Sequence, residues 1–290
     1  MTVTAKQIAQ LEASLSAAQS CLKYLATELA SLVPDPPPPS SGMTQPAGFT
    51  TLYFSDDFPG PALGAVWLPN MGDLKNGIWR NNGTLPAPYS GSSSGAFNAE
   101  YDNPKMIVAN DGLLTISAMR DTSQPGYLWA SGCIRTTATV VPAAHCYVQV
   151  RAKVPSGAGM WAGIWMLDTN GGSEIDILES GYGLGSTPTN REVAVNVHDT
   201  GDAQSIYTAP EDLSLDFHVY ACEYLPGQLV RFYLDGVLIA TYTQDVPTGA
   251  YELIVNLQVA QGSTGWHPIV TQATPSPETL SVSGVEVWTL

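Results

Sequence analysis

Three acidic residues within a span of six, Glu174, Asp176 and Glu179, are the strongest candidates for chemistry in this chain of 290 residues. They lie in the segment 171–179, which reads Gly-Gly-Ser-Glu-Ile-Asp-Ile-Leu-Glu and carries no other charge. Clustering like charges where water is partly excluded destabilises a fold, so such a cluster usually serves a reaction. Two carboxyl groups about 5–5.5 Å apart can hydrolyse a glycosidic bond with retention of configuration, one as the nucleophile and the other as the acid and then the base.

The spacing of the three acids requires a particular strand geometry. On a regular β-strand Glu174 and Asp176 share one face, whereas Glu179 points to the other. One extra residue, a β-bulge, would return Glu179 to the first face. We therefore predict a bulged strand whose three acids line a groove. A calcium site or a solvated edge strand is the alternative, but calcium loops alternate Gly with Asn or Asp rather than carrying an Ile-Asp-Ile-Leu run.

Tryptophans close to this segment favour a sugar-binding groove. A predicted strand over 161–167 places Trp161 and Trp165 on one face. Indoles stack on the apolar faces of sugar rings, although alternating aromatic residues are also common in protein cores. Trp129 and Trp266 lie in polar or Gly-rich segments and are further candidates for substrate contact.

The composition narrows the classes of partner. With 26 acidic and 11 basic residues the net charge is −15, which repels phosphate backbones and anionic membranes. We therefore expect neither a nucleic acid nor a membrane as partner, and a neutral substrate is favoured. The sequence contains no apolar run long enough for a transmembrane helix. Its first residues show no basic region followed by an apolar stretch, so no signal peptide is seen.

From about residue 50 onward the hydrophobic period is two, as in β-strands. Two turn signals, Asn110-Asp111-Gly112 and Asp235-Gly236, join neighbouring apolar runs. The predicted strands are 106–109, 113–119, 133–137, 145–154, 161–167, 193–198, 218–224, 230–234, 237–242, 252–260 and 282–289. Many short strands with regular turns indicate an all-β antiparallel sandwich or barrel.

The N-terminal residues follow a different pattern. Apolar residues recur at alternating intervals of three and four, at Ile8, Leu11, Leu15, Ala18, Leu22, Leu25, Leu29 and Leu32. This heptad pattern predicts an α-helical coiled coil over residues 4–33 and hence a homo-oligomer, for which a trimer is reasonable. A single amphipathic helix packed on the domain is the alternative. We divide the chain into this oligomerisation helix (1–33), a Pro-rich linker (34–50) and a catalytic domain (51–290).

At the acidic segment the chain resembles glycoside hydrolase family 16, in particular its laminarinase-like branch, which carries a bulged E-x-D-x-x-E signature. Other segments match in the family's order, and the similarity spans roughly 51–290: they are 56–58, 131–136, 150–155, 159–167, 217–220, 232–236 and 285–288. The resemblance implies a β-jelly-roll of two curved antiparallel sheets with a concave cleft. It implies Glu174 as the nucleophile, Asp176 as its electrostatic partner and Glu179 as the general acid/base.

The resemblance also implies roles for four residues outside the signature. His198 matches a histidine of the cleft near the nucleophile, with a strand-end histidine as the alternative. Asn98 and Glu100 stand where the family has a substrate-contacting loop. Many members hold a structural calcium with an aspartate near the C-terminus, and Glu286 occupies the matching place. The reaction itself is expected to need no cofactor.

The leading hypothesis is a retaining endo-β-glycosidase that hydrolyses internal β-1,3 or mixed β-1,3/1,4 linkages of a glucan. The same branch cleaves agarose and carrageenan, but sulfated substrates would require basic groove residues, and this chain has few. One alternative is a polysaccharide-binding protein without turnover. Another, suggested by the coiled coil and linker, is a depolymerase of a bacterial exopolysaccharide carried on a virion tail. Extracellular action is expected in each case.

Overall fold

A computed structural model describes residues 43–69, 73–75, 78–80, 100–123, 128–168, 172–181, 189–260 and 270–290, with backbone alone for 73–75, 78–80 and 100–102. The predicted helix over 4–33 and most of the predicted linker lie outside these residues. No described helix is long and apolar enough to cross a membrane.

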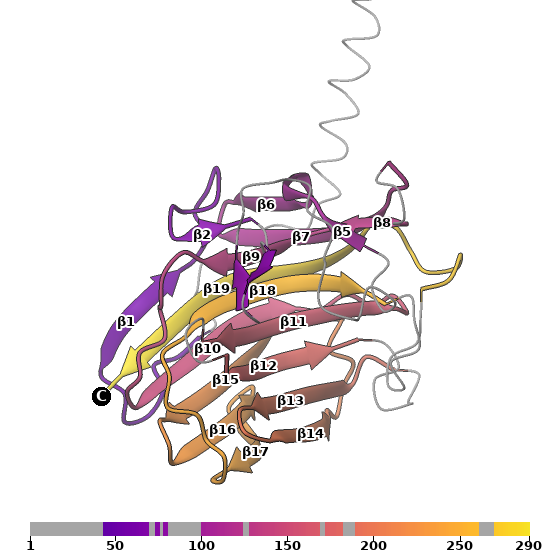
Figure 1. Cartoon of the computed structure of the whole chain (residues 1–290). Coiled ribbons are helices and arrows are strands. Elements are labelled where there is room, and N and C mark those ends of the chain that lie inside the picture. Colours follow the sequence, from indigo (N-terminus) through magenta and orange to yellow (C-terminus); the bar gives the residue numbers. More distant parts are fainter. Residues whose placement is uncertain are drawn as a thin grey trace, which may run out of the picture. The chain divides into compact units, whose positions relative to one another are not determined.

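The domain is a sandwich of two mainly antiparallel sheets (Figure 1). The ten-stranded sheet contains, in spatial order, β17 (Val237–Tyr242), β16 (Leu229–Leu234), β15 (His218–Leu225), β10 (Cys146–Lys153), β19 (Glu278–Thr289), β7 (Leu113–Arg120), β8 (Trp129–Ser131) and β5 (Glu100–Asp102), with β1 (Thr51–Asp56) on β19 and β6 (Ile107–Asn110) on β7. The seven-stranded sheet contains β14 (Asp202–Thr208), β13 (Glu192–His198), β12 (Glu174–Ser180), β11 (Met160–Leu167), β18 (Glu252–Val259), β9 (Cys133–Thr136) and β2 (Trp67–Leu68).

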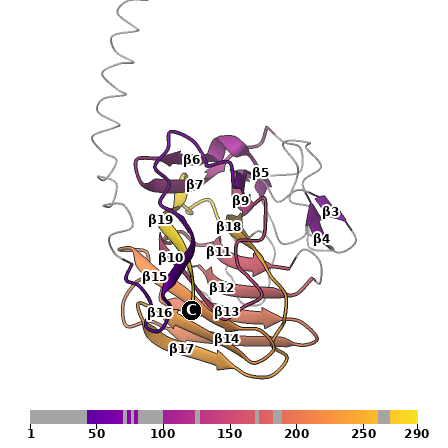
Figure 2. The same cartoon turned by 90° about the vertical axis from the view of Figure 1, so that its left-hand side faces the viewer.

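Three further short elements are described. A 3-10 turn, η2 (Pro104–Met106), leads into β6, and β3 (Asp73–Lys75) pairs with β4 (Ile78–Arg80) in a separate hairpin. The two layers are visible in Figure 2, with β10, β15 and β19 in one and β11, β12 and β13 in the other. This architecture confirms the predicted all-β fold of two antiparallel sheets.

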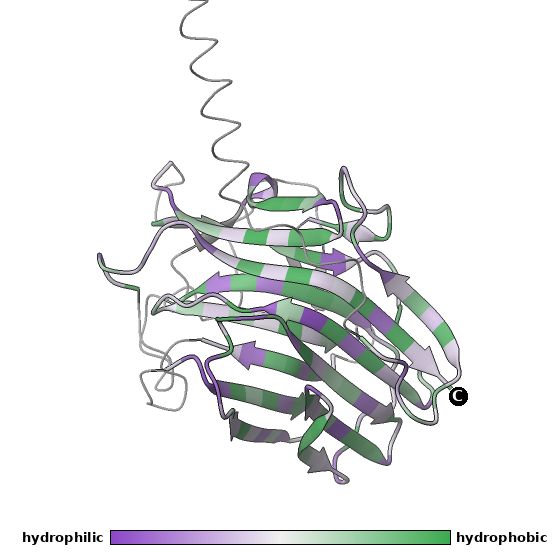
Figure 3. Ribbon diagram, turned by 180° about the vertical axis from the view of Figure 1, so that it is seen from behind, coloured by the Kyte–Doolittle hydropathy of each residue, from purple (hydrophilic) through white to green (hydrophobic). Residues whose placement is uncertain are grey.

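Alternation of side chains along the strands builds the core between the sheets. On β10, Val148 and Val150 are fully buried, whereas Tyr147 before them and Arg151 after them are partly exposed. Figure 3 shows the same alternation of apolar and polar residues along many strands. Burying each large aliphatic side chain stabilises the fold by about 1.5–3 kcal/mol. Because the inner faces supply this stabilisation, the outer faces of the sheets can carry polar groups.

The eleven strands predicted from periodicity are all present, and most end within two residues of the predicted limits. The 110–112 turn forms with positive φ at Asp111 (51°) and Gly112 (83°), as a tight hairpin turn requires. Strand β19 begins at Glu278, earlier than predicted. Its first residues pair with β7, but they are mostly polar and therefore give no apolar period in the sequence. Strand β14 was not predicted, since the exposed face of this edge strand mixes polar residues with Ile206 and so breaks the apolar–polar alternation.

Residues before Thr51 already contact the domain. The ring of Phe49 is buried and lies 5.0 Å from that of His145 and 5.6 Å from that of Tyr147. Gln149 Nε2 donates a hydrogen bond to the carbonyl oxygen of Thr44 at 3.1 Å. Ordered packing therefore begins within the segment assigned to the linker.

Candidate active site

The predicted β-bulge is present in β12. Gly163 on β11 pairs with Glu179, but Trp165 pairs with Asp176, so β12 carries one extra residue between the two pairs. The same shift occurs against β13. Two consecutive side chains, those of Ile177 and Leu178, both belong to the core between the sheets, whereas on a regular strand they would point to opposite faces. Their burial in the core turns the three acids to the opposite face of the sheet.

Glu179 receives hydrogen bonds from two neighbouring strands. Trp161 Nε1 on β11 donates to Oε1 at 3.0 Å, and Asn196 Nδ2 on β13 donates to Oε2. Burial and then the negative charge of Asp176 raise the pKa of Glu179 to about 8, although the two hydrogen bonds and His198 lower it. Glu179 therefore keeps a proton near neutral pH, as a general acid must.

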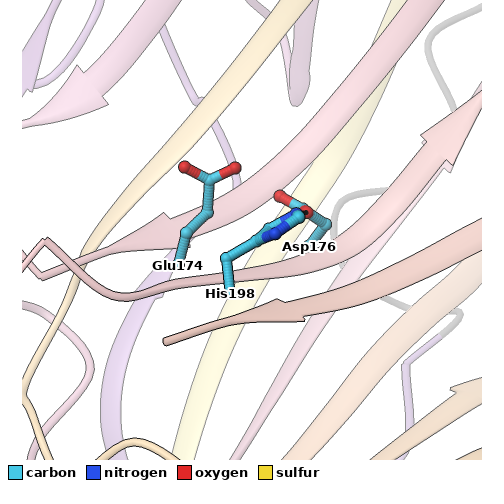
Figure 4. A group of neighbouring side chains, drawn as sticks. All are labelled: Glu174, Asp176 and His198. Atoms are coloured by element: carbon cyan, nitrogen blue, oxygen red, sulfur yellow. Dashed lines mark ion pairs between the residues drawn. The ribbon is translucent and has the colours of Figure 1, made fainter. Parts of the chain in front are cut away.

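His198 links two carboxylates at the end of β13. Its Nε2 lies 3.2 Å from Asp176 Oδ2, and its Nδ1 lies 2.6 Å from Asp202 Oδ1. The hydrogen bond to Asp176, followed by that to Asp202, raises the pKa of His198 to about 10, so the ring is a cation at neutral pH. Figure 4 shows the side chains of Glu174, Asp176 and His198 projecting to the same side of β12 and β13.

The surroundings of Glu174 disfavour a negative charge. Burial, and next the carboxylate of Asp176, raise its pKa well above the ordinary value, whereas the His198 cation lowers it. Ligating atoms of Glu174, Asp176 and His198 all lie within 4.8 Å of one another. The cation thus offsets part of the repulsion that an ionised Glu174 would meet from Asp176.

Trp165 shares the face of Trp161 but has another partner. Its Nε1 donates a hydrogen bond to Asn256 Oδ1 on β18 at 3.0 Å, and only 7% of the residue is exposed. Gly163 makes room for this contact, because a Cβ at that position would lie 2.5 Å from Asn256 Oδ1. Trp165 is therefore part of the floor beside the acids.

Two functional residues, Asn196 and Asn256, were missed from the sequence. Each is almost fully buried and has apolar residues directly before and after it in its strand. A lone amide in such a strand must find hydrogen-bond partners, and this was the signal available in the sequence. Its partner could not be named, because that depends on the pairing of distant strands.

Of the other predicted contact residues, only Trp129 has a described side chain, and it lies away from the carboxylates. Trp129 lies in β8 of the ten-stranded sheet, is 1% exposed and packs under the Arg120 guanidinium at 4.7 Å, so it is a core residue and its prediction as a substrate contact was wrong. Glu100 begins β5, for which only the backbone is described. Asn98 and Trp266 lie outside the described residues.

The surroundings of Glu286 do not fit the calcium site that the resemblance implies. Its Oε2 accepts hydrogen bonds from Gln149 Nε2 and Trp288 Nε1, both at 2.7 Å. Calcium takes oxygen ligands, but both groups are N–H donors. Within the described ranges, the one group of three or more acidic, His or Cys side chains close enough to share an ion is that of Glu174. We therefore place no calcium at Glu286.

The sequence model described as glycosyl hydrolases family 16 matches residues 93–268. The chain belongs to this family. Among curated relatives of this family-16 chain, a glucan endo-1,3-beta-glucosidase A1 of Niallia circulans is 26% identical over 271 residues, which cover 82% of this chain and 37% of that protein. A glucan endo-1,3-beta-glucosidase of Cryptopygus antarcticus is 26% identical over 278 residues, covering 83% of this chain and 93% of that protein.

Solved structures with the same fold include an endo-beta-1,3-glucanase from Pyrococcus furiosus, with a TM-score of 0.67, 26% identity, and coverage of 82% of this chain and 94% of that one. The laminarinase catalytic domain of Thermotoga maritima has a TM-score of 0.66 at 24% identity and shares the fold, with coverage of 83% and 98%. The chain spans only 37% and 51% of two curated relatives, the protein of Niallia circulans and a beta-glucanase of Acetivibrio thermocellus.

Proposed function

We propose that this family-16 chain is a retaining endo-β-glucanase that hydrolyses internal β-1,3 or mixed β-1,3/1,4 linkages of a neutral glucan. The observation that carries the proposal is the bulge in β12, which brings a protonated Glu179 to the same face as Glu174 and Asp176. The names of the relatives, glucan endo-1,3-beta-glucosidases and beta-glucanases, support the substrate class.

The reaction proceeds by two displacements. Glu174 attacks the anomeric carbon, and Glu179 gives its proton to the departing glycosidic oxygen. Glu179, now a carboxylate, then takes a proton from water, which attacks the same carbon and frees Glu174. The carboxylate of Asp176 raises the pKa of both Glu174 and Glu179, and the His198 cation bonded to Asp176 lowers both. All of these steps use side chains of the chain, and no cofactor is needed.

The charges near the acids favour a neutral glucan over a sulfated one. Arg135 lies on the same face of the seven-stranded sheet, because its neighbour Ile134 is in the core. The Arg135 guanidinium, however, is bonded to Glu252 at 2.6 Å. His198 is likewise bonded to two carboxylates. Both of these cations are thus already paired with carboxylates, which supports a neutral substrate.

Reducing-sugar release from laminarin tests the proposal. Glu174→Gln and Glu179→Gln should each lower the rate by about 10²–10⁴-fold, because each role needs an ionisable carboxyl group. Glu211→Gln, at an exposed carboxylate, is the control and should leave the rate unchanged. Proton NMR of the first product should show the β-anomer. Early release of the α-anomer, or no release by the wild-type protein from any β-glucan, would overturn the proposal.

We also propose that residues 4–33 form a coiled coil that assembles several copies of the chain, for which three is a reasonable number, and that the protein acts outside the cell on a polymeric substrate. The heptad pattern and the Pro-rich segment after it support the assembly. Light scattering on the full chain and on a chain lacking residues 1–42 tests it. A monomeric full-length protein at micromolar concentration would contradict the assembly.

A further inference from the structure

A second groove lies on the opposite side of the sandwich from the carboxylates. It has a volume of about 770 Å³ and is bounded by the segment 44–49 and by strands β10, β15 and β16. These strands belong to the ten-stranded sheet, and residues alternating with the buried Val148 and Val150 face the groove. We call it the outer groove. Its size is in the range of pockets that bind small molecules, about 300–1,000 Å³.

The outer groove is lined by a row of aromatic rings. The rings of Tyr147 and Tyr233 lie 5.5 Å apart, and the ring of Phe49 lies 5.6 Å from that of Tyr147. Tyr147 and Tyr233 are partly exposed, so part of each ring is free to contact a ligand. Burial raises the pKa of both phenols, so both stay neutral. The two partly exposed rings, inclined at 42° to one another, offer neutral apolar surface against which the C–H groups of sugar units can pack.

Polar side chains between the rings are held in place by one another. Glu223 accepts hydrogen bonds from Tyr233 Oη at 2.9 Å and from Arg231 Nη1 at 3.3 Å, and it lies 3.0 Å from His145 Nε2. Gln149 is anchored to the carbonyl oxygen of Thr44. A site whose side chains are already fixed loses little freedom when a ligand binds.

The charges of the outer groove favour a neutral ligand. Its acids are paired: Glu223 bonds to Arg231 and lies beside His145, and Asp235 Oδ2 lies 2.7 Å from His218 Nδ1. Arg231, the arginine that lines the groove, forms its ion pair with Glu223. An anionic ligand would also meet the net charge of −15 of the chain. Aromatic faces, hydrogen-bonding groups and balanced charge together match a chain of neutral sugars.

We propose that the outer groove is a second binding site for the neutral glucan whose linkages the carboxylate site cleaves. The inference rests on the proposed function for the identity of the sugar polymer. The groove holds one stretch of the polymer while another stretch reaches the carboxylates on the other side of the domain. Holding the polymer raises its effective concentration at the carboxylate site, so the groove matters for long or insoluble glucans and not for short ones.

Three substitutions test the outer groove. Tyr233→Ala removes a stacking face, Ala47→Leu narrows the groove from an exposed position of the 44–49 segment without adding a ring or a hydrogen-bonding group, and Tyr233→Phe keeps the ring but loses the hydroxyl. Tyr53→Ala is the matched control, since Tyr53 is a 54% exposed tyrosine on β1 that does not line the groove.

Retention on insoluble β-1,3-glucan is measured first, in the inactive Glu179→Gln background. Tyr233→Ala and Ala47→Leu should each weaken retention at least about fivefold, whereas Tyr233→Phe and Tyr53→Ala should be retained as strongly as the parent protein. In the active protein, the same two groove variants should slow release from the insoluble glucan but leave kcat/KM on a short soluble oligosaccharide within about twofold.

Equal retention of the groove variants and the Tyr53→Ala control would overturn the second site. So would a loss of kcat/KM on the short oligosaccharide as large as the loss on the polymer. Retention is read without turnover, so a failure of the proposed hydrolysis is a separate result. If the wild-type protein binds the insoluble glucan through the groove but releases no sugar, the second binding site is supported and the proposed hydrolase activity is refuted. If the inactive protein is not retained at all, the groove proposal falls.

Discussion

Replacing Glu179 with glutamine should stabilise the folded protein at alkaline pH while it removes the activity. Burial and the neighbouring Asp176 raise the pKa of Glu179 from 4.5 to about 8. The folded chain therefore holds this proton more tightly than the unfolded chain does. The stability that the proton contributes is fully present below about pH 4.5 and is lost as the pH rises to about 8. Glutamine is neutral at every pH, so the variant should not show this loss.

The size of the effect follows from the shift. One pKa unit corresponds to about 1.4 kcal/mol, so the upper bound on the loss is about 5 kcal/mol. Coupling to Glu174 and Asp176 reduces it, because the same charges act on all three groups. The new amide offers one acceptor where the carboxylate offered two. Asn196 Oδ1 is buried and has no hydrogen-bond partner in the described part of the chain, so it can turn to accept from that amide.

Urea unfolding at about pH 5, 7 and 9 measures the difference. We expect Glu179→Gln to match the wild type near pH 5 and to exceed it by about 1–3 kcal/mol near pH 9. The exposed Glu211→Gln should follow the wild type at every pH. A difference between Glu179→Gln and the wild type that is the same at all three pH values would refute the reasoning, because the free energy would then not come from a proton on Glu179.

The charges around Glu179 also determine how the rate depends on pH. Activity should fall as the pH rises through about 8, when Glu179 loses the proton that the leaving oxygen needs, and a flat profile there would contradict this. Asp176→Asn should move this alkaline limit to lower pH, because Asp176 raises the pKa of Glu179; His198→Ala should move it to higher pH, because the His198 cation lowers that pKa. Shifts in the same direction in the two pH–rate profiles would contradict the charges assigned. Gly163→Ala should lower kcat with unchanged circular dichroism, because its Cβ would displace Asn256 from Trp165; wild-type kcat would show that this contact is dispensable.

The acids and their bulge could be predicted from sequence because the evidence is local. The face of a strand residue depends on its own position, and Ile177 and Leu178 must both reach the core. Turn residues such as Asp111 and Gly112 are local in the same sense. Strand existence and the chemistry of the signature therefore followed from neighbours in the chain.

What could not be predicted depends on which strands lie side by side. Asn196 and Trp161 are 35 positions apart, yet both donate to Glu179, because β11 and β13 flank β12. Trp129 shows the opposite error. Its sequence surroundings are those of a loop, but it lies in β8 of the ten-stranded sheet, where Arg120 covers its ring. Periodicity and composition contain no information on either arrangement.

Trp161 and Trp165 show how one face can carry two separate functions. Both indoles point to the side of the acids, and both N–H groups need an acceptor. The indole N–H of Trp161 donates to Oε1 of Glu179 and so orients the carboxyl group that transfers the proton. Trp165 finds Asn256 instead, across the gap that Gly163 leaves by having no side chain. The glycine thus keeps the second indole on the amide of β18, and the two carboxylate oxygens of Glu179 are left to Trp161 and Asn196. These two donors hold the carboxyl group of Glu179 in place, and because they lower its pKa they also ease the transfer of its proton to the glycosidic oxygen.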